Sequence, residues 1–250
     1  MNIKNDIIES LKNQKEIFGD DLYSSIKLSK PKIEIKTKTD SPLVVANNRR
    51  TKIETNYSIS QFQNITTLEQ FDDEINTCQK CGLGATRNQF VFGVGNPNAD
   101  LMLIGEAPGA EEDKHGIPFV GRAGKLLNDI LIAIKFNRED VFITNILKCR
   151  PPNNRDPLPE EREVCKPYLY KQIDLIKPKV ILCLGKVAAN VMLNNNESLT
   201  KMRGNIHEIN GIKTMVTYHP AALLRNPNWK KPTWEDVQKL RKLYDQLVNK

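Results

Sequence analysis

The sequence predicts an α/β protein, a three-layer α/β/α sandwich with a mostly parallel central sheet. Three short apolar runs bounded by polar residues or glycine are typical of buried parallel strands, and they span Leu101–Ile104, Val141–Thr144 and Lys179–Gly185. Segments whose apolar residues recur at helical spacing separate these runs, which is the pattern of βαβ units. The apolar runs are all far shorter than the roughly 20 residues of a membrane-spanning helix.

The chain is expected to divide into an N-terminal extension, residues 1–75, and a domain, residues 76–250. Residues 5–18 have the spacing of a short amphipathic helix, while residues 28–60 are rich in Lys, Thr, Ser and Asn without a period, as in a flexible tether. The extension is either inert or carries a helix that binds a repair or replication partner. Its charged start lacks the apolar core of a signal peptide, so we expect a cytoplasmic protein.

The remaining elements follow from local signals. Thr66-Thr-Leu-Glu69 fits a capping box and predicts a helix that ends near Ile75. Val91–Gly95 is expected to be a strand or strand edge. Asn210-Gly211 lies between two apolar segments and predicts a hairpin with a type I′ turn. Further helices are predicted over 122–134, from Pro159 to about Ile176, through Val191 and Met192, and from about Thr233 to Val248.

The stretch from Gly105 to Gly121 is the first candidate for function. It follows a predicted core strand, and in open α/β sheets ligands bind where the loops at the carboxyl ends of the strands converge. The loop is rich in glycine and acidic residues, including Glu106 and Glu112. Phe119 is an apolar aromatic in a polar loop and needs either the core or a flat ligand as a partner. The loop runs into a helix N-terminus, which attracts anions.

The formal net charge is +7, and the basic excess lies entirely in residues 76–250. A basic domain favours a polyanionic partner such as nucleic acid, although a merely lysine-rich surface gives the same balance.

Four of the five cysteines have a spacing that indicates metal binding. Cys78 and Cys81 form a chelating pair, and Cys149 and Cys165 come from later elements, which together offer four thiolates. Only one pair is close in sequence, which favours an iron–sulfur cluster over zinc without excluding zinc. Such a centre would join distant parts of the domain and play a structural role. Cys183 lies inside an apolar run and is expected to be a buried small hydrophobe.

Several motifs together resemble the family 4 uracil-DNA glycosylases, which carry a 4Fe–4S cluster. The motifs are Gly105-Glu-Ala-Pro-Gly109, Gly116-Ile-Pro-Phe-Val-Gly-Arg-Ala-Gly124, Ile143-Thr-Asn-Ile-Leu-Lys-Cys-Arg-Pro-Pro152 and His219-Pro-Ala-Ala-Leu-Leu-Arg225, with Cys78-x-x-Cys81 in front. The resemblance covers residues 76–248 and implies an α/β/α sandwich that cleaves the N-glycosidic bond of uracil in DNA and leaves an abasic site.

The resemblance also implies roles for individual residues. Cys78, Cys81, Cys149 and Cys165 would hold the 4Fe–4S cluster. Gly105, Glu106 and Ala107 would line a uracil pocket, with Phe119 stacked on the base, Asn145 reading its edge and His219 beside it. Many members have glycine at the position of Ala107, so the room above the pocket is expected to differ here.

The chemistry of the reaction accounts for the same residue types. His219 can donate to uracil O2 as negative charge develops on the departing base. A carboxylate can position water, and both Glu112 and Glu106 are candidates; Glu112 can alternatively crowd C5 and exclude thymine. These three, Glu112, Glu106 and His219, are the predicted catalytic residues.

We expect a monomer that binds uracil-containing DNA, single- or double-stranded. Leu223 and Leu224 either wedge into the gap left by a flipped base or pack within their loop, and phosphates are expected to meet Arg225, Arg203, Lys125 and Lys201. Two other functions fit the sequence: a non-catalytic iron–sulfur or zinc protein that binds DNA, and a hydrolase of a nucleotide or nucleoside that uses the glycine-rich loop as a phosphate cradle.

Overall fold

A computed structural model describes residues 50–51 and 62–248. Its seven-stranded sheet has the order β1-β6-β7-β5-β3-β4-β2. The strands are β1 (Arg50–Thr51), β2 (Val94–Gly95), β3 (Leu101–Gly105), β4 (Phe142–Asn145), β5 (Val180–Leu184), β6 (His207–Ile209) and β7 (Ile212–Thr217). The four central strands, β7, β5, β3 and β4, are parallel, while β6 and β2 pair antiparallel with β7 and β4.

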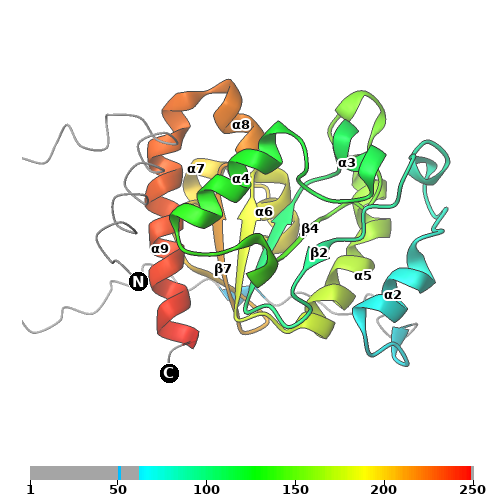
Figure 1. Cartoon of the computed structure of the whole chain (residues 1–250), viewed down its shortest axis with the longest axis horizontal. Helices are drawn as coiled ribbons and strands as arrows, with labels where there is room; N and C mark the ends of the chain where they lie inside the picture. Colours follow the sequence, from blue (N-terminus) through cyan, green and yellow to red (C-terminus); the bar gives the residue numbers. More distant parts are fainter. Residues whose placement is uncertain (1–49, 52–61, 249–250) are drawn as a thin grey trace, which may run out of the picture.

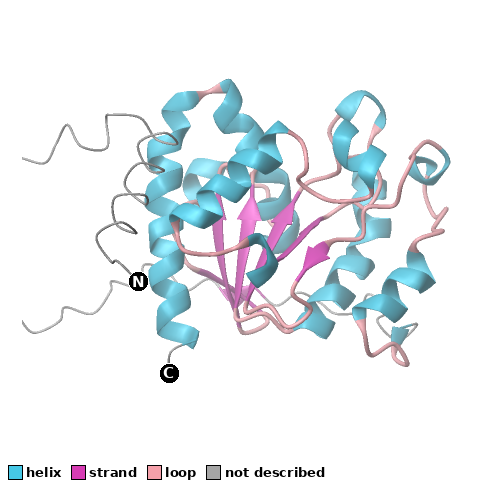
Figure 2. Cartoon of the chain, viewed as in Figure 1, coloured by secondary structure: helices cyan, strands magenta, loops and turns pink. Residues whose placement is uncertain are grey.

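Helices cover both faces of the sheet (Figures 1 and 2). The α-helices are α2 (Leu68–Ile75), α3 (Ala110–His115), α4 (Arg122–Ala133), α5 (Pro159–Ile176), α6 (Lys186–Leu193), α7 (Leu199–Met202), α8 (Pro220–Arg225) and α9 (Lys230–Val248). Short 3₁₀ segments are η3 (Gly82–Ala85), η4 (Arg138–Asp140), η5 (Pro152–Asn154) and η6 (Pro227–Trp229). None of the helices in the described part of the chain has the length and apolar character that crossing a bilayer requires.

Successive residues of each central strand point into two different apolar cores. In β3, Leu101 and Leu103 pack with α4, α8 and α9, whereas Met102 and Ile104 pack with α2, α5 and α6. All five residues of β3 and of β5 are buried. A strand that is covered on both faces has no solvent-exposed side, so its residues do not alternate between apolar and polar. Such a strand is therefore a continuous apolar run in the sequence. The predicted three-layer sandwich is confirmed.

Most predicted boundaries agree with the structure, and the hairpin turn is confirmed because Asn210 and Gly211 both have positive φ, 49° and 86°. α5 begins at Pro159, as predicted. The cap of α2 is Thr67 rather than Thr66, and its side chain accepts from the Gln70 N–H at 3.2 Å. α3 and α8, which lie in segments that we expected to be loops, are short helices.

The predicted boundary at residue 75 does not separate α2 from the body of the domain. Phe62, Phe71 and Ile75 are buried in the same core cluster as Tyr168 of α5, and the Phe62 and Tyr168 ring centroids lie 5.9 Å apart. β1 lies inside the predicted tether and pairs with β6. The expected helix over residues 5–18 lies outside the described residues.

Candidate active site

A cavity of about 400 Å³ lies at the carboxyl ends of β3 and β4. It is lined by residues from four separate segments: Glu106, Ala107, Pro108, Gly109, Glu112, Phe119, Ala123, Asn145, Pro151, Asn154, Arg155, Asp156, His219, Ala221 and Arg225. Phe119, Asn145 and His219, which were predicted to meet at one site, therefore share one hollow. Its place at the strand ends is the usual ligand position of parallel α/β sheets.

Phe119 is held in place by two glycines. A Cβ on Gly105 would lie 2.3 Å from Asn145 Oδ1 and 2.7 Å from Phe119 Cζ, so only glycine leaves room for both side chains. A Cβ on Gly124 would lie 1.9 Å from the carbonyl oxygen of Phe119. Phe119 itself has a positive φ of 54°, a conformation that a bulky residue keeps only where its surroundings fix it. Its ring centroid lies 5.4 Å from that of His219, with 30° between the planes.

Asn145 lines the cavity, and its side chain carries a hydrogen-bond acceptor that no described residue uses. The residue ends β4 and is only 2% exposed. Its Oδ1 is buried and has no hydrogen-bond partner among the described residues. Leaving such an oxygen unpaired costs about 1–3 kcal/mol. A ligand with an N–H group at this point would recover that cost.

His219 is held as a neutral imidazole with a defined tautomer. It caps the N-terminus of α8, where its Nδ1 accepts a hydrogen bond from the Ala221 N–H at 3.2 Å. The pKa of His219 is lowered to about 4, chiefly by burial and secondly by the positive charge of Arg225, while Glu112 acts in the opposite direction. Because Nδ1 is the acceptor, the proton of the neutral ring is on Nε2. His219 is therefore a hydrogen-bond donor at neutral pH.

The two candidate carboxylates have different surroundings. Glu112 accepts hydrogen bonds from three backbone N–H groups, those of Gly109 at 3.1 Å, Val120 at 2.9 Å and Gly121 at 3.0 Å. It closes the loop that carries Phe119. The pKa of Glu106 is raised by burial and by Asp156, against a smaller opposing effect of Arg162.

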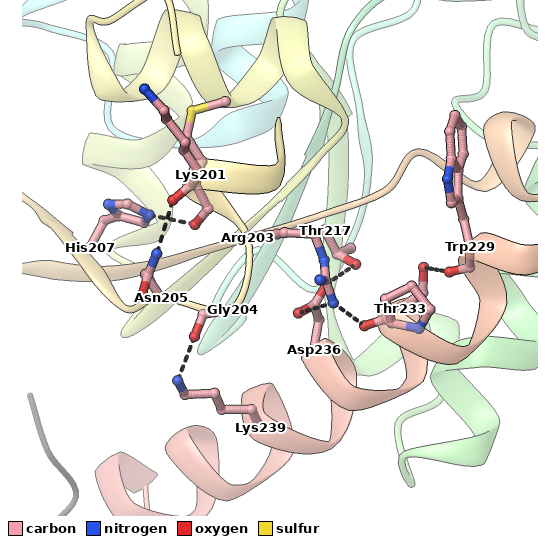
Figure 3. Close-up of polar contacts among 12 residues, drawn as sticks. Lys201, Arg203, Gly204, Asn205, His207, Thr217, Trp229, Thr233, Asp236 and Lys239 are labelled. Carbon is pink, nitrogen blue, oxygen red and sulfur yellow. Dashed lines mark hydrogen bonds and ion pairs between the residues drawn. The ribbon is translucent and has the colours of Figure 1, made fainter. Parts of the chain in front are cut away.

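The predicted DNA-contacting residues are only partly at the surface. Leu223 is 1% exposed and packs in the core, so the expectation that it enters DNA is corrected; Leu224, on the next position of α8, is 40% exposed. Arg203 does not extend from the surface as expected, because Nε and Nη2 bind Asp236 at 3.0 and 3.1 Å (Figure 3). Arg225 lines the cavity, and Lys125 and Lys201 are exposed.

The four predicted metal ligands lie in one cluster of the core. Cys149 and Cys165 are buried, and the half-buried Cys78 and Cys81 pack against the same cluster. Burial raises the pKa of Cys149 and raises that of Cys165 to about 12. In the part of the chain that the structure describes, no three metal-binding side chains are placed so that they could hold an ion. The donor set nevertheless fits a metal–thiolate centre, since four sulfurs from distant segments share one apolar cluster.

Hydrogen bonds to these sulfurs come from neighbouring side chains. Tyr168 Oη donates to Cys78 Sγ at 3.1 Å, and Arg87 Nη1 donates to Cys149 Sγ at 3.3 Å. Donors of this kind favour thiolates, which supports the same interpretation. Cys183 is fully buried in β5, as expected.

One wall of the cavity was not predicted from the sequence. Pro151, Asn154, Arg155 and Asp156 line it, and Asn153 and Asn154 both have positive φ, 55° and 53°. The signal that could have located this wall is the pair of asparagines after two prolines, since Asn tolerates the left-handed conformation that a tight turn next to a ligand often needs.

The fold and the cavity define a class: an α/β/α protein with a hollow at its strand ends that an aromatic ring, an amide and an imidazole line together. Residues 92–240 match the family model of the uracil DNA glycosylase superfamily. Three type-4 uracil-DNA glycosylases are similar to the chain over most of their own length. The one from Archaeoglobus fulgidus is 45% identical over 187 residues, which cover 70% of this chain and 94% of that protein.

The relative from Sulfurisphaera tokodaii is 46% identical over 186 residues, covering 71% of this chain and 84% of its own. The relative from Thermotoga maritima is 43% identical over 178 residues, covering 70% and 93%. The chain belongs to the uracil DNA glycosylase superfamily and, within it, to the type-4 uracil-DNA glycosylases.

Proposed function

We propose that this protein removes uracil from DNA by hydrolysing its N-glycosidic bond, leaving an abasic site as the first step of base-excision repair. The observation that carries this proposal is the buried, unpaired Oδ1 of Asn145 in a cavity that also holds Phe119 and His219. A flat heterocycle with an N–H group is the ligand that this combination fits. Family membership supports the same activity.

Asn145 selects uracil by its edge. Uracil presents an N3–H donor next to the O4 acceptor, and the Asn145 amide offers Oδ1 and Nδ2–H in the complementary order. Cytosine presents the opposite order and would leave two buried polar groups unpaired. Discrimination by one bidentate contact is worth about 1–3 kcal/mol, and more where the mismatched groups stay buried.

The base must leave the DNA stack to reach the cavity, because its edge is inaccessible within a duplex. The ring of Phe119 would recover part of the stacking energy that is lost on flipping. Gly105 keeps the floor of the cavity open beneath the ring, since a side chain there would collide with both Asn145 and Phe119.

Bond cleavage sends the electron pair of the C1′–N1 bond to uracil, which leaves as an anion, while the sugar gains oxocarbenium character. His219 would donate from Nε2 to uracil O2 and stabilise the anion without giving up its proton, and backbone N–H groups of Glu106 and Ala107 would assist. Water then attacks C1′ and loses a proton, which a carboxylate can accept. We assign this carboxylate to Glu106, because Glu112 is engaged with three backbone groups.

We further propose that Cys78, Cys81, Cys149 and Cys165 hold a 4Fe–4S cluster. When bound, the cluster would supply a structural cross-link between η3, the loop after β4 and α5, with no part in bond cleavage. The protein would act on single- or double-stranded DNA, as a monomer in the cytoplasm, and the N-terminal extension is a candidate to bind a repair or replication partner.

A uracil-containing oligonucleotide tests the function directly. The purified protein is incubated with a labelled strand that contains one uracil, and alkali then cleaves any abasic site. We expect one cleavage product at the uracil and none in matched strands with cytosine or thymine. A strand that is retarded in a gel but stays intact would indicate a non-catalytic binder, and a strand that is neither bound nor cleaved would favour a hydrolase of small nucleosides.

A further inference from the structure

An exposed tryptophan has no role in the chemistry above, although it stacks on the residue that precedes His219 in the chain. Trp229 of η6 is 37% exposed, one of the few large apolar side chains at the surface of the described residues. One face of its indole is stacked on Tyr218, with ring centroids 4.8 Å apart and 12° between the planes. Because Tyr218 covers one face of the indole, a second ring would have to stack on the opposite face.

The stack is held rigidly from behind. The Arg203 guanidinium lies over the Tyr218 ring, with its carbon 5.5 Å from the ring centroid. The same guanidinium is bound to the buried Asp236, and it donates to the Pro232 carbonyl oxygen at 2.6 Å (Figure 3). Asp236 also accepts from Thr217 Oγ1 at 2.8 Å, just before Tyr218 in the chain. An exposed ring that is fixed in this way loses little entropy when a second ring stacks on it.

The position of the indole relates it to the cavity. Tyr218 directly precedes His219, and α8, which His219 caps, ends at Arg225 in the cavity wall. η6 follows at once, with the Trp229 N–H bonded to the Asn226 carbonyl oxygen at 3.1 Å. Lys230 and Lys231 come next, at the start of α9. In the chain, Trp229 thus lies between Arg225, which lines the cavity, and two lysines that suit a phosphate backbone.

We propose that Trp229 is a stacking platform for a base of the DNA strand next to the flipped uracil, an inference that rests on the proposed function. Stacking on an aromatic side chain accepts any base, because every base has a π-face. The platform would therefore grip the strand beside the lesion without reading its sequence. It would also keep the strand aligned while the uracil occupies the cavity.

Fluorescence gives a direct test, because the chain has two tryptophans and the other, Trp234, is 5% exposed. A single-stranded oligonucleotide with one stable abasic-site analogue is titrated into the protein. We expect quenching of the emission in the wild type and in Trp234→Phe, and little quenching in Trp229→Phe, where only the buried indole remains.

Uracil excision under single-turnover conditions provides the second readout. Trp229→Ala should raise the half-saturating enzyme concentration about tenfold, with a much smaller effect on the maximal rate, and Trp229→Phe should restore most of the affinity. Ile132→Ala removes another exposed apolar side chain, at the far end of α4, and serves as the matched control. Thermal melts of each variant establish that it is folded.

The outcomes separate the two proposals. If the wild type excises uracil but DNA leaves the Trp229 emission unchanged, or Trp229→Ala binds as well as the wild type, the platform is refuted and the glycosylase stands. If quenching is specific to Trp229 but no uracil is released, the contact with DNA stands and the proposed function fails. A protein that neither binds nor cleaves the strand refutes both.

Discussion

At the scale of single residues, two asparagines each have a buried side-chain oxygen without a hydrogen-bond partner, but only one of them lines the cavity. Oδ1 of Asn145 and Oδ1 of Asn190 are both buried without a hydrogen-bond partner among the described residues. The first belongs to a residue that lines the cavity, so an N–H group of the proposed ligand would account for it. The second lies on α6, away from the cavity, and nothing in the structure explains it. The same Asn→Asp substitution can therefore be compared at a position in the cavity and at a position outside it.

Asn145→Asp should lower kcat/KM for uracil excision by about a hundredfold or more, because an ionised carboxylate cannot donate to O4. Asn190→Asp is the control and should leave kcat/KM nearly unchanged. Steady-state cleavage of the uracil strand measures both. Equal activity of Asn145→Asp and the wild type would remove Asn145 from the recognition of uracil.

The depressed pKa of His219 makes a prediction about pH. Its folded pKa of about 4 lies below the ordinary value near 6.5, so the fold favours the neutral ring. The stability that this contributes is present in full above about pH 6.5 and is lost as the pH falls towards 4. We expect the single-turnover rate to show no inflection from His219 between pH 6 and 8. A titration of the His219 ring near pH 6.5, followed by NMR, would contradict this.

At the scale of elements, α3 joins two loops through adjacent carboxylates. Glu112 binds the backbone around Gly121, while Asp113, which is 2% exposed, accepts from the backbone N–H and the Nδ2 of Asn88 at 2.9 and 2.6 Å. A six-residue helix thus fixes the segment that carries Phe119 to the segment that follows the first cysteine pair. Acidic residues of this stretch are candidates for catalysis, but two of them, Glu112 and Asp113, also hold the loops of the site in place through hydrogen bonds.

Glu112→Ala should destabilise the protein by about 1–3 kcal/mol and lower both affinity and kcat, because three backbone N–H groups lose a charged acceptor and the Phe119 loop loosens. Urea unfolding and uracil cleavage are measured together. Glu111→Ala, at an exposed neighbouring position, should change neither. A loss of kcat at unchanged stability and unchanged KM would instead assign Glu112 to the positioning of water.

The sequence was most informative where burial alone decides the structure. β3 and β5 are covered on both faces, and their apolar runs located them to within a residue. α3 and α8 were missed because six residues with Gly109 or Pro220 at their start show no full helical period. The motifs identified Phe119, Asn145 and His219 in the cavity but not the wall that follows Pro151. The burial of Leu223 and the Arg203–Asp236 pair depend on the packing of α9, which no local pattern encodes.

At the scale of the whole molecule, the four cysteines bring together α2, α5 and the segment after β4, which the hydrogen bonds of the sheet do not join. Cys78 and Cys81 follow α2, Cys149 follows β4, and Cys165 lies in α5. The spacing of the cysteines predicts the set of four, but their arrangement depends on where α2 and α5 pack. A metal bound by all four would hold these elements together and stabilise the folded state in proportion to its affinity.

Purified protein is therefore expected to contain about four iron atoms per chain. Cys165→Ser should lower the iron content and the melting temperature, by about 5 °C or more. Cys183→Ser, a matched change at a buried cysteine outside the cluster, should keep the iron. Metal analysis and thermal melts measure both. Stoichiometric zinc, or equal iron content in both variants, would overturn the proposed ligand set.

The short run from Tyr218 to Lys231 supplies the imidazole of His219 and the guanidinium of Arg225, which line the cavity, and the exposed indole that stacks on Tyr218. Under the proposed function, catalysis and DNA binding would therefore share one short segment. Both flanks of this segment meet the Arg203–Asp236 pair, because Thr217 donates to Asp236 and Arg203 donates to the Pro232 carbonyl oxygen. A lineage that adapts its hold on DNA by drifting in this run would alter its speed of repair in the same step.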